Sequence, residues 1–285
     1  MDLVLRAGTA DDARDCGRIC YESFARLADD HGFPHDFPDV ETATGSVATL
    51  LTHPGFYSVV AELDGRIIGS NFLDERSPIV GVGPITVDPA VQNRGVGRRL
   101  MQNVLRRAAE RQVPGVRLLQ SGYHCRSFAL YAELGFEFRE TLACLQGSPL
   151  HQAVDGYMVR RAVDEDLPAC NELCRRVHGV DRGGELADAI QQGAARVVEH
   201  GGRLTGYATG LAFFAHAVGE TTEDIKALIG AAPSFGGMGI LVPASNSALL
   251  QWCLHNDLRV VQLLSLMTIG LYNEPAGAYL PSVLY

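Results

Sequence analysis

The stretch VDPAVQNRGVGRRLM, residues 87–101, decides the fold of the first half of the chain. It places glycines and arginines between an expected strand that ends near Val87 and an expected helix from Gly95 to about Arg111. Three interpretations compete for it: a nucleotide-binding loop, a coenzyme A loop, or an ordinary helix start that contains glycine. The identities of the surrounding residues separate them.

Both nucleotide-binding motifs fail. A P-loop needs Lys followed by Ser or Thr after its glycines, and no such pair follows Gly97. A dinucleotide loop that began at Gly95 would need a third glycine where Leu100 stands. What remains is Gln92-x-x-Gly95-x-Gly97 at a helix start, where backbone N–H groups and the helix dipole attract an anion. The stretch predicts a diphosphate site.

Composition predicts a soluble, two-domain protein. A length of 285 residues exceeds one typical domain, and 47% hydrophobic residues can supply two cores. We expect no leader and no membrane span. Seven cysteines without a C-x-x-C pair indicate reduced thiols in the cytoplasm. A net charge of -9 argues against nucleic acid as a partner.

The chain contains an internal repeat. VAELDGRIIG (60–69) matches VVEHGGRLTG (197–206), and each contains a dipeptide typical of a tight hairpin turn. Upstream, Arg6 and Asp12 match Arg160 and Asp166. Each half is therefore expected to run strand, helix, then hairpin. We predict one domain over residues 1–147 and a second over residues 155–285.

Two motifs in the first half resemble the GNAT superfamily of acyl-CoA N-acyltransferases. They are QNRGVG (92–97), which matches the coenzyme A motif Q/R-x-x-G-x-G/A, and LYAELGF (130–136). The resemblance covers about residues 3–145, whereas the second half depends on the repeat alone. It implies an α/β fold with two GNAT-like domains in tandem, each a mixed, mostly antiparallel sheet flanked by helices.

The resemblance also implies a site and a mechanism. Acetyl-CoA, the co-substrate, would lie between the fourth and fifth strands, held by backbone groups and by the glycine loop, with no metal. The expected binding residues are Ile85, Val87, Gln92, Asn93, Arg94, Gly95, Val96, Gly97 and Arg98. An amine would attack directly, and Tyr131 would protonate the leaving thiolate. The alternative for Tyr131 is a core aromatic residue.

Two departures qualify this picture. Where many family members carry Asn, the chain has His124, which could steady the same turn or act as a base with a pKa near neutrality. In the second half the expected coenzyme loop is replaced by GETTEDIKALIG (219–230), whose acidic first turn would repel an anion, and no tyrosine occurs between Asn246 and Asp257. The second domain is therefore predicted to be degenerate and without acyl-CoA.

The first half also has an extra segment, residues 31–46. Its histidines and prolines make a poor metal site, so we expect either a lid or an ordinary mobile loop. Its aromatic and acidic residues could bind an ammonium group in a pocket shared with the second domain: Phe33, Asp36, Phe37 and Asp39.

The sequence thus predicts an N-acetyltransferase that acts on a primary amine of a small molecule or peptide, as a monomer or homodimer. A non-catalytic acyl-CoA sensor is the alternative.

Overall fold

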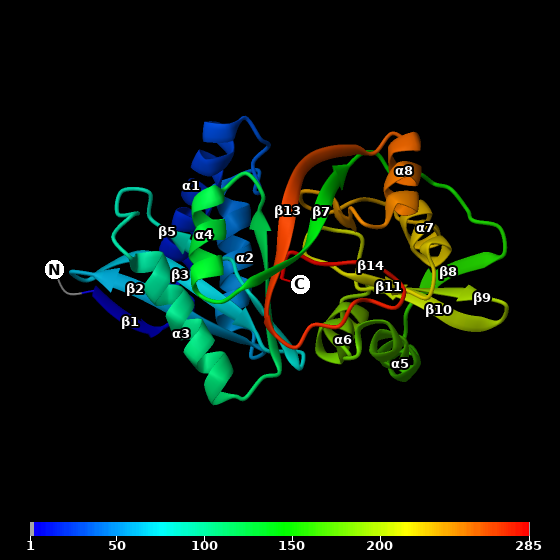
Figure 1. Ribbon diagram of the computed structural model, residues 1–285, viewed down its shortest axis with the longest axis horizontal. Coiled ribbons are helices and arrows are strands. Elements are labelled where there is room, and N and C mark those ends of the chain that lie inside the picture. Colours follow the sequence, from blue (N-terminus) through cyan, green and yellow to red (C-terminus); the bar gives the residue numbers. More distant parts are fainter. Residues whose placement is uncertain (1–2, 285) are drawn as a thin grey trace.

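The computed structural model describes residues 3–284, which form two sheets flanked by helices (Figure 1). The first sheet contains β1 (Leu3–Ala7), β2 (Phe56–Leu63), β3 (Arg66–Asp74), β4 (Ile79–Val82), β5 (Thr86–Val87), β6 (Gly115–Ser121), β7 (Glu137–Gln146), β12 (Ile240–Pro243) and β13 (Arg259–Gly270). The second contains β8 (Tyr157–Arg161), β9 (Arg196–His200), β10 (Arg203–Ala208), β11 (Ala217–Gly219) and β14 (Ala278–Leu280). The predicted α/β class with tandem domains is confirmed.

Four helices accompany each half. In the first half they are α1 (Ala13–His31), α2 (Val40–Thr52), α3 (Val96–Glu110) and α4 (Cys125–Glu133). In the second half they are α5 (Leu167–His178), α6 (Gly183–Gln191), α7 (Thr222–Gly230) and α8 (Ser247–His255). Among residues 3–284, no helix is both long and apolar enough to cross a membrane.

The first sheet separates two helix layers, because alternate strand residues point to opposite faces. Val60 and Phe72 pack with α1 and α2, whereas Val59 and Leu73 pack with α3. The predicted helix after the glycine loop is confirmed as α3, with Val104 on its buried face. These layers place the start of α3 beside the end of β5.

The two halves exchange strands. β13 follows α8 in the second half, yet it lies between β6 and β7 and pairs antiparallel with both, so that Leu264 faces Ser121 on one side and Leu142 on the other. β12 extends the same sheet beyond β7. The predicted boundary at 147–155 lies between β7 and β8, but the two sequence halves do not form two separate sheets.

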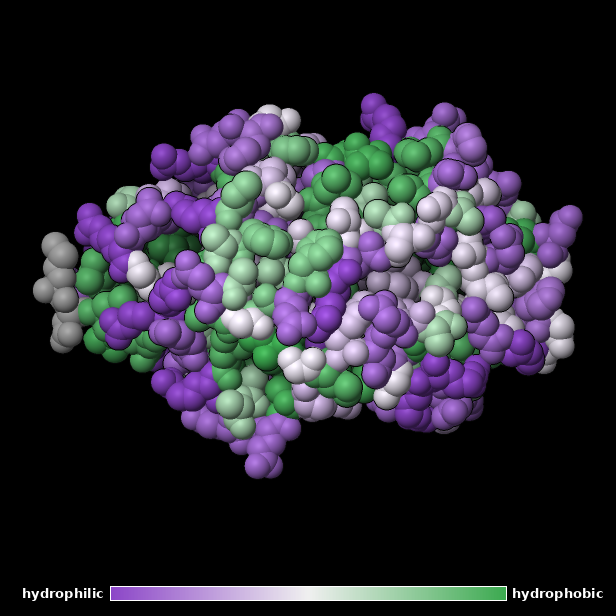
Figure 2. Space-filling model, viewed as in Figure 1, coloured by the Kyte–Doolittle hydropathy of each residue, from purple (hydrophilic) through white to green (hydrophobic). Residues whose placement is uncertain are grey.

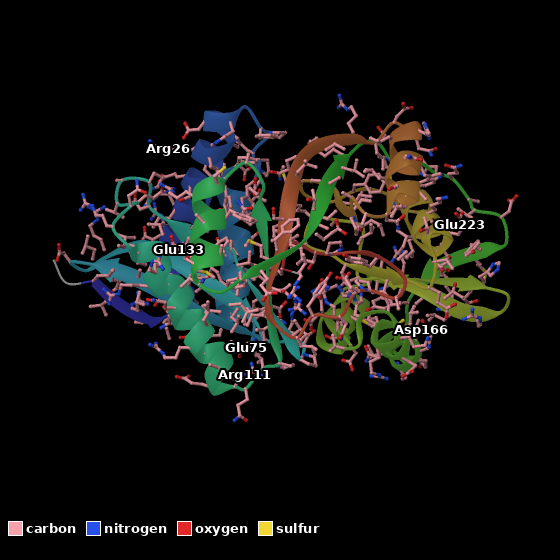
Figure 3. All side chains as sticks on the ribbon, viewed as in Figure 1. Arg26, Glu75, Arg111, Glu133, Asp166 and Glu223 are labelled. Atoms are coloured by element: carbon pink, nitrogen blue, oxygen red, sulfur yellow. The ribbon has the colours of Figure 1, made fainter. Side chains whose placement is uncertain are left out.

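The two copies of the internal repeat form the same group of ion pairs. In each half one arginine binds two carboxylates, one ahead of the first helix and one on the second strand: Arg6 with Asp12 and Glu62, and Arg160 with Asp166 and Glu199. Hydrogen bonds from Arg6 lower the pKa of Asp12 to about 2. Figure 3 marks Asp166, and also Glu75, which pairs with Arg111 at the end of α3.

The extra segment is not the irregular insert that the sequence suggested. Its second part begins α2, because the Asp39 carboxylate caps this helix by accepting a hydrogen bond from the Thr42 backbone N–H at 2.7 Å. The second half has a shorter counterpart in α6. Only residues 32–39 form a connection of their own between α1 and α2.

The strand exchange predicts cooperative unfolding of the whole chain. Met267 on β13 is fully buried in the core of the first half, so Met267→Ala should lower the free energy of unfolding by about 3 kcal/mol. Leu263 on the same strand is 50% exposed, so Leu263→Ala should change the free energy of unfolding little. Figure 2 shows apolar residues gathered over β7 and β13. Chemical denaturation followed by tryptophan fluorescence and circular dichroism checks this, and two separate transitions would contradict it.

Candidate active site

A break in one strand opens the first sheet. β4 pairs in parallel with β6 only from Ile79 to Gly81, and the chain then passes through Gly83 and Pro84. Proline has no N–H to donate to a ladder. β5 resumes beside β3, with Thr86 opposite Ser70. Beyond the break, β5 and β6 therefore diverge, as the family resemblance implied.

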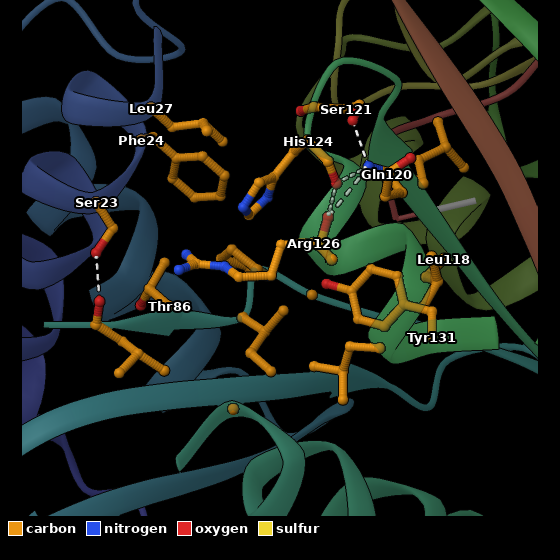
Figure 4. Close-up of a pocket in the computed structure, with 18 of the residues that line it drawn as sticks. Ser23, Phe24, Leu27, Thr86, Leu118, Gln120, Ser121, His124, Arg126 and Tyr131 are labelled. Atoms are coloured by element: carbon orange, nitrogen blue, oxygen red, sulfur yellow. Dashed lines mark hydrogen bonds between the residues drawn. The ribbon is translucent and has the colours of Figure 1, made fainter. Parts of the chain in front are cut away.

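A cavity of about 1020 Å³ lies in this opening. Residues 82–87 line one side and residues 118–121 the other. The cavity continues past α1 and α4 to residues of the second half. Figure 4 shows that Ser23 and Phe24 of α1 face His124, Arg126 and Tyr131 across it.

The backbone of β5 presents polar groups to the cavity. The Asp88 N–H donates to the Ile68 carbonyl at 2.9 Å, so Asp88 faces β3. Because neighbouring residues in a strand point their N–H groups to opposite sides, Val87 directs its N–H away from β3. Its carbonyl already accepts hydrogen bonds from the Ser23 hydroxyl at 3.0 Å and the Gln92 side-chain amide at 3.1 Å.

The glycine loop, residues 92–97, forms the mouth of the cavity. Its two glycines, Gly95 and Gly97, differ in backbone conformation and surroundings. Gly95 has φ 80°, a left-handed conformation that glycine adopts without strain. Gly97 lies inside α3, and a Cβ there would come no nearer than 3.8 Å to any neighbour, at Val87. Neither backbone conformation nor packing within the chain requires glycine at position 97.

Most of the predicted loop residues line the cavity, but Arg94 does not; it is exposed to solvent. Val96 buries its side chain in the core, which leaves only its backbone for a ligand. Arg98 pairs with Glu133 at the surface, an ion pair of the weakly stabilising kind.

Arg126 is a loop contact that the sequence analysis missed. From the first turn of α4 it donates to the Asn93 side-chain oxygen at 2.8 Å and to the Gln92 side-chain oxygen at 2.7 Å. It therefore braces the glycine loop from the opposite wall. In the sequence, the only signal for this role of Arg126 was its position one residue after Cys125, at a helix start.

Tyr131 and His124 both line the cavity. Figure 4 shows the Tyr131 hydroxyl directed into it, while the ring packs edge-on against Phe136. Burial raises the pKa of Tyr131 above its ordinary value, so the phenol is protonated at neutral pH. Burial and the charge of Arg126 lower the pKa of His124 to about 4, which argues against the option of a base with a pKa near neutrality and agrees better with a histidine of the turn.

The residues of the segment between α1 and α2 lie in different surroundings. Asp36 and Phe37 line the cavity. Phe33 instead stacks on Tyr123 at a centroid distance of 4.3 Å, and Asp39 caps α2. His35 bonds to an α1 carboxylate at 2.8 Å, and no cluster among residues 3–284 groups three or more potential metal-binding side chains.

The second half completes the cavity from the far side. Phe213 and Phe214 lie before α7, and Val283 and Leu284 follow β14; all four line it. The Val283 N–H donates to the Phe213 carbonyl at 2.8 Å, which joins the two segments. The sequence predicted a shared pocket but gave no signal for these residues, because they meet only after the strands exchange.

The equivalent opening of the second half is filled by its own chain. β11 precedes α7 and β12 precedes α8, so these strands correspond to the diverging pair of the first half. β14 lies against both: it pairs with β11, placing Leu280 opposite Ala217, and contacts β12. At the start of α7, the Thr221 N–H donates to the buried Asp224 carboxylate at 2.8 Å. The Asp224 carboxylate thus occupies the start of α7, where an anion would otherwise bind.

Comparisons with known proteins agree with this architecture. Residues 20–136 match the sequence model of the acetyltransferase (GNAT) family. A segment of 82 residues is 33% identical to the mycothiol acetyltransferase of Tsukamurella paurometabola, and the match covers 28% of this chain and 28% of that protein.

Solved structures extend the likeness to the whole chain. A proposed acetyltransferase from Pyrococcus horikoshii is 18% identical with a TM-score of 0.73, covering 97% of this chain and 94% of its own. A tandem GNAT protein from the clavulanic acid biosynthesis pathway is 15% identical with a TM-score of 0.56, covering 94% and 98%. At these identities the likeness concerns the fold. The family match itself covers residues 20–136, and over nearly the whole chain the likeness is to the fold of tandem GNAT proteins.

Proposed function

We propose that the protein transfers an acetyl group from acetyl-CoA to a primary amine, in the cavity of the first half. The observation that carries the proposal is the opening between β5 and β6 with a glycine loop and a helix start at its mouth. A narrow cleft lined by backbone groups suits an extended chain, and a helix N-terminus suits a diphosphate.

The residues at the cavity fit acetyl-CoA. The loop N–H groups from Asn93 to Arg98 would hold the diphosphate, and Gly97 leaves it room. The β5 backbone at Ile85 and Val87 would hold the pantetheine arm. Bound acetyl-CoA supplies a thioester whose carbonyl carbon accepts the amine. A strand N–H directed at the carbonyl oxygen would stabilise negative charge there.

Tyr131 is the proposed general acid. Its buried phenol keeps its proton at neutral pH and points into the cavity. A thiol has an ordinary pKa of about 8.5, so the leaving thiolate is basic enough to take a proton from a positioned donor. The second half contributes walls to the cavity and no second coenzyme site.

The first prediction concerns binding. Calorimetric titration should show one acetyl-CoA per chain, because β14 fills the equivalent opening. Gly97→Ala should fold normally, since a Cβ has space and alanine favours helix, yet weaken acetyl-CoA binding about tenfold, or about 1.4 kcal/mol. Gly45→Ala, in the exposed middle of α2 and also without close neighbours, is the matched control. Two equivalent sites per chain, or unchanged affinity in Gly97→Ala, would contradict the assignment.

The second prediction concerns Tyr131. Tyr131→Phe keeps the ring and its packing but removes the proton, so kcat should fall by about 100-fold while the acetyl-CoA Kd stays unchanged. Tyr57→Phe, which loses a hydrogen bond to Asn103 outside the cavity, controls for removal of a phenol. The assay follows free thiol released from acetyl-CoA with a panel of primary amines. An unaltered kcat would make Tyr131 a core residue, and acetyl-CoA binding without thiol release would indicate a sensor.

A further inference from the structure

One part of the cavity lining is aromatic. Phe24 of α1 lies 6.4 Å from Phe37, and Phe37 lies 6.4 Å from Phe214 of the second half, measured between ring centroids. Val283 and Leu284 add aliphatic surface there. Three segments distant in the sequence thus build one apolar wall, and both halves are needed for it.

A carboxylate adjoins this wall in the sequence and in the cavity. Asp36 precedes Phe37 and lines the same cavity. Its charge acts on Cys20 of α1, on Tyr123 and on Cys144 of β7, and His35 interacts electrostatically with it. Within residues 3–284, no hydrogen bond or ion pair satisfies the Asp36 carboxylate.

Asp36 is partly buried, and no protein group in the described part of the chain partners its carboxylate. Removing a charge from water costs free energy unless a partner of opposite charge or a hydrogen bond compensates. Burial accordingly raises the pKa of Asp36 to about 6. Above that pH the group is an anion held against aromatic rings, and ring faces also attract cations. The two features together suit an ammonium group attached to an apolar body.

We propose that Asp36 binds the ammonium group of the acceptor and removes its proton, and that the acceptor is a primary amine carried on an aromatic or bulky apolar group. This inference depends on the proposed acetyl transfer. Asp39, three residues further on, is exposed and occupied by its capping hydrogen bond, so the assignment distinguishes two acids of one segment.

The proton balance is complete with residues of the cavity. The ammonium gives one proton to the Asp36 carboxylate, which passes it to solvent. The free amine forms the C–N bond as the C–S bond of the thioester breaks, and the nitrogen loses its second proton to solvent. The departing sulfur takes the Tyr131 proton, and solvent restores the phenol. The products are the acetylated amine, coenzyme A thiol and one proton.

The test uses 2-phenylethylamine and 2-phenylethanol, which share a ring and differ in the ammonium group. Calorimetry on the full chain with acetyl-CoA withheld should show at least tenfold tighter binding of the amine at pH 7.5. Asp36→Asn should remove that preference and leave the acetyl-CoA Kd unchanged. Its thermal midpoint should not fall, because a neutral amide replaces a poorly solvated charge.

Asp39→Asn is the matched control, because asparagine caps helices as well as aspartate does, and it should retain the preference. The wild-type preference should decline as pH falls through about 6, where Asp36 gains a proton. Equal binding of amine and alcohol to the wild type, or an unchanged preference in Asp36→Asn, would overturn the inference. Ethylamine binding as tightly as 2-phenylethylamine would overturn the apolar acceptor. Loss of acetyl transfer with every amine tested, while ammonium binding persists, would instead refute the proposed function.

Discussion

The insertion of β13 between β6 and β7 is the constraint on which the rest of the molecule depends. An interior strand supplies hydrogen bonds to both neighbours, so removing it would leave two ladders of backbone groups without partners. It also carries Met267 into the core beneath α3 and α4. The first half therefore has no complete sheet without a strand from the second, and the cavity beside β6 is supported by residues of both.

The same exchange explains how the second half contributes walls to the cavity of the first half. The chain leaves β13, forms β14 in the second sheet and returns toward the cavity with Val283 and Leu284. Ser282 accepts a hydrogen bond at 3.3 Å from the buried Arg182, which also binds Glu185 at 2.5 Å. This buried pair fixes the returning segment, and breaking it would leave an uncompensated charge in the interior. The segment that fills the opening of the second half thus also positions a wall of the cavity in the first half.

Local patterns predicted a large part of the fold. The helix expected from Gly95 to about Arg111 and the two hairpins were predicted correctly, because each depends on neighbouring residues alone. The two matched ion-pair groups around Arg6 and Arg160 confirm that the repeat is structural. The extra segment was misread because a single capping residue, Asp39, decided between loop and helix.

The sequence by itself determined which half carries the coenzyme motif, since glycine at position 97 and Tyr131 at the α4 position are local choices of residue type. Only the tertiary structure decided which side chains share the cavity. Arg126 reaches the loop across the opening, Phe37 packs against Phe214 of the other half, and β14 occupies the second opening. Each of these contacts joins segments that are distant in the sequence. Strand pairing over more than a hundred positions leaves no periodic signal in the sequence, because backbone groups make it and every residue type except proline has both the donor and the acceptor.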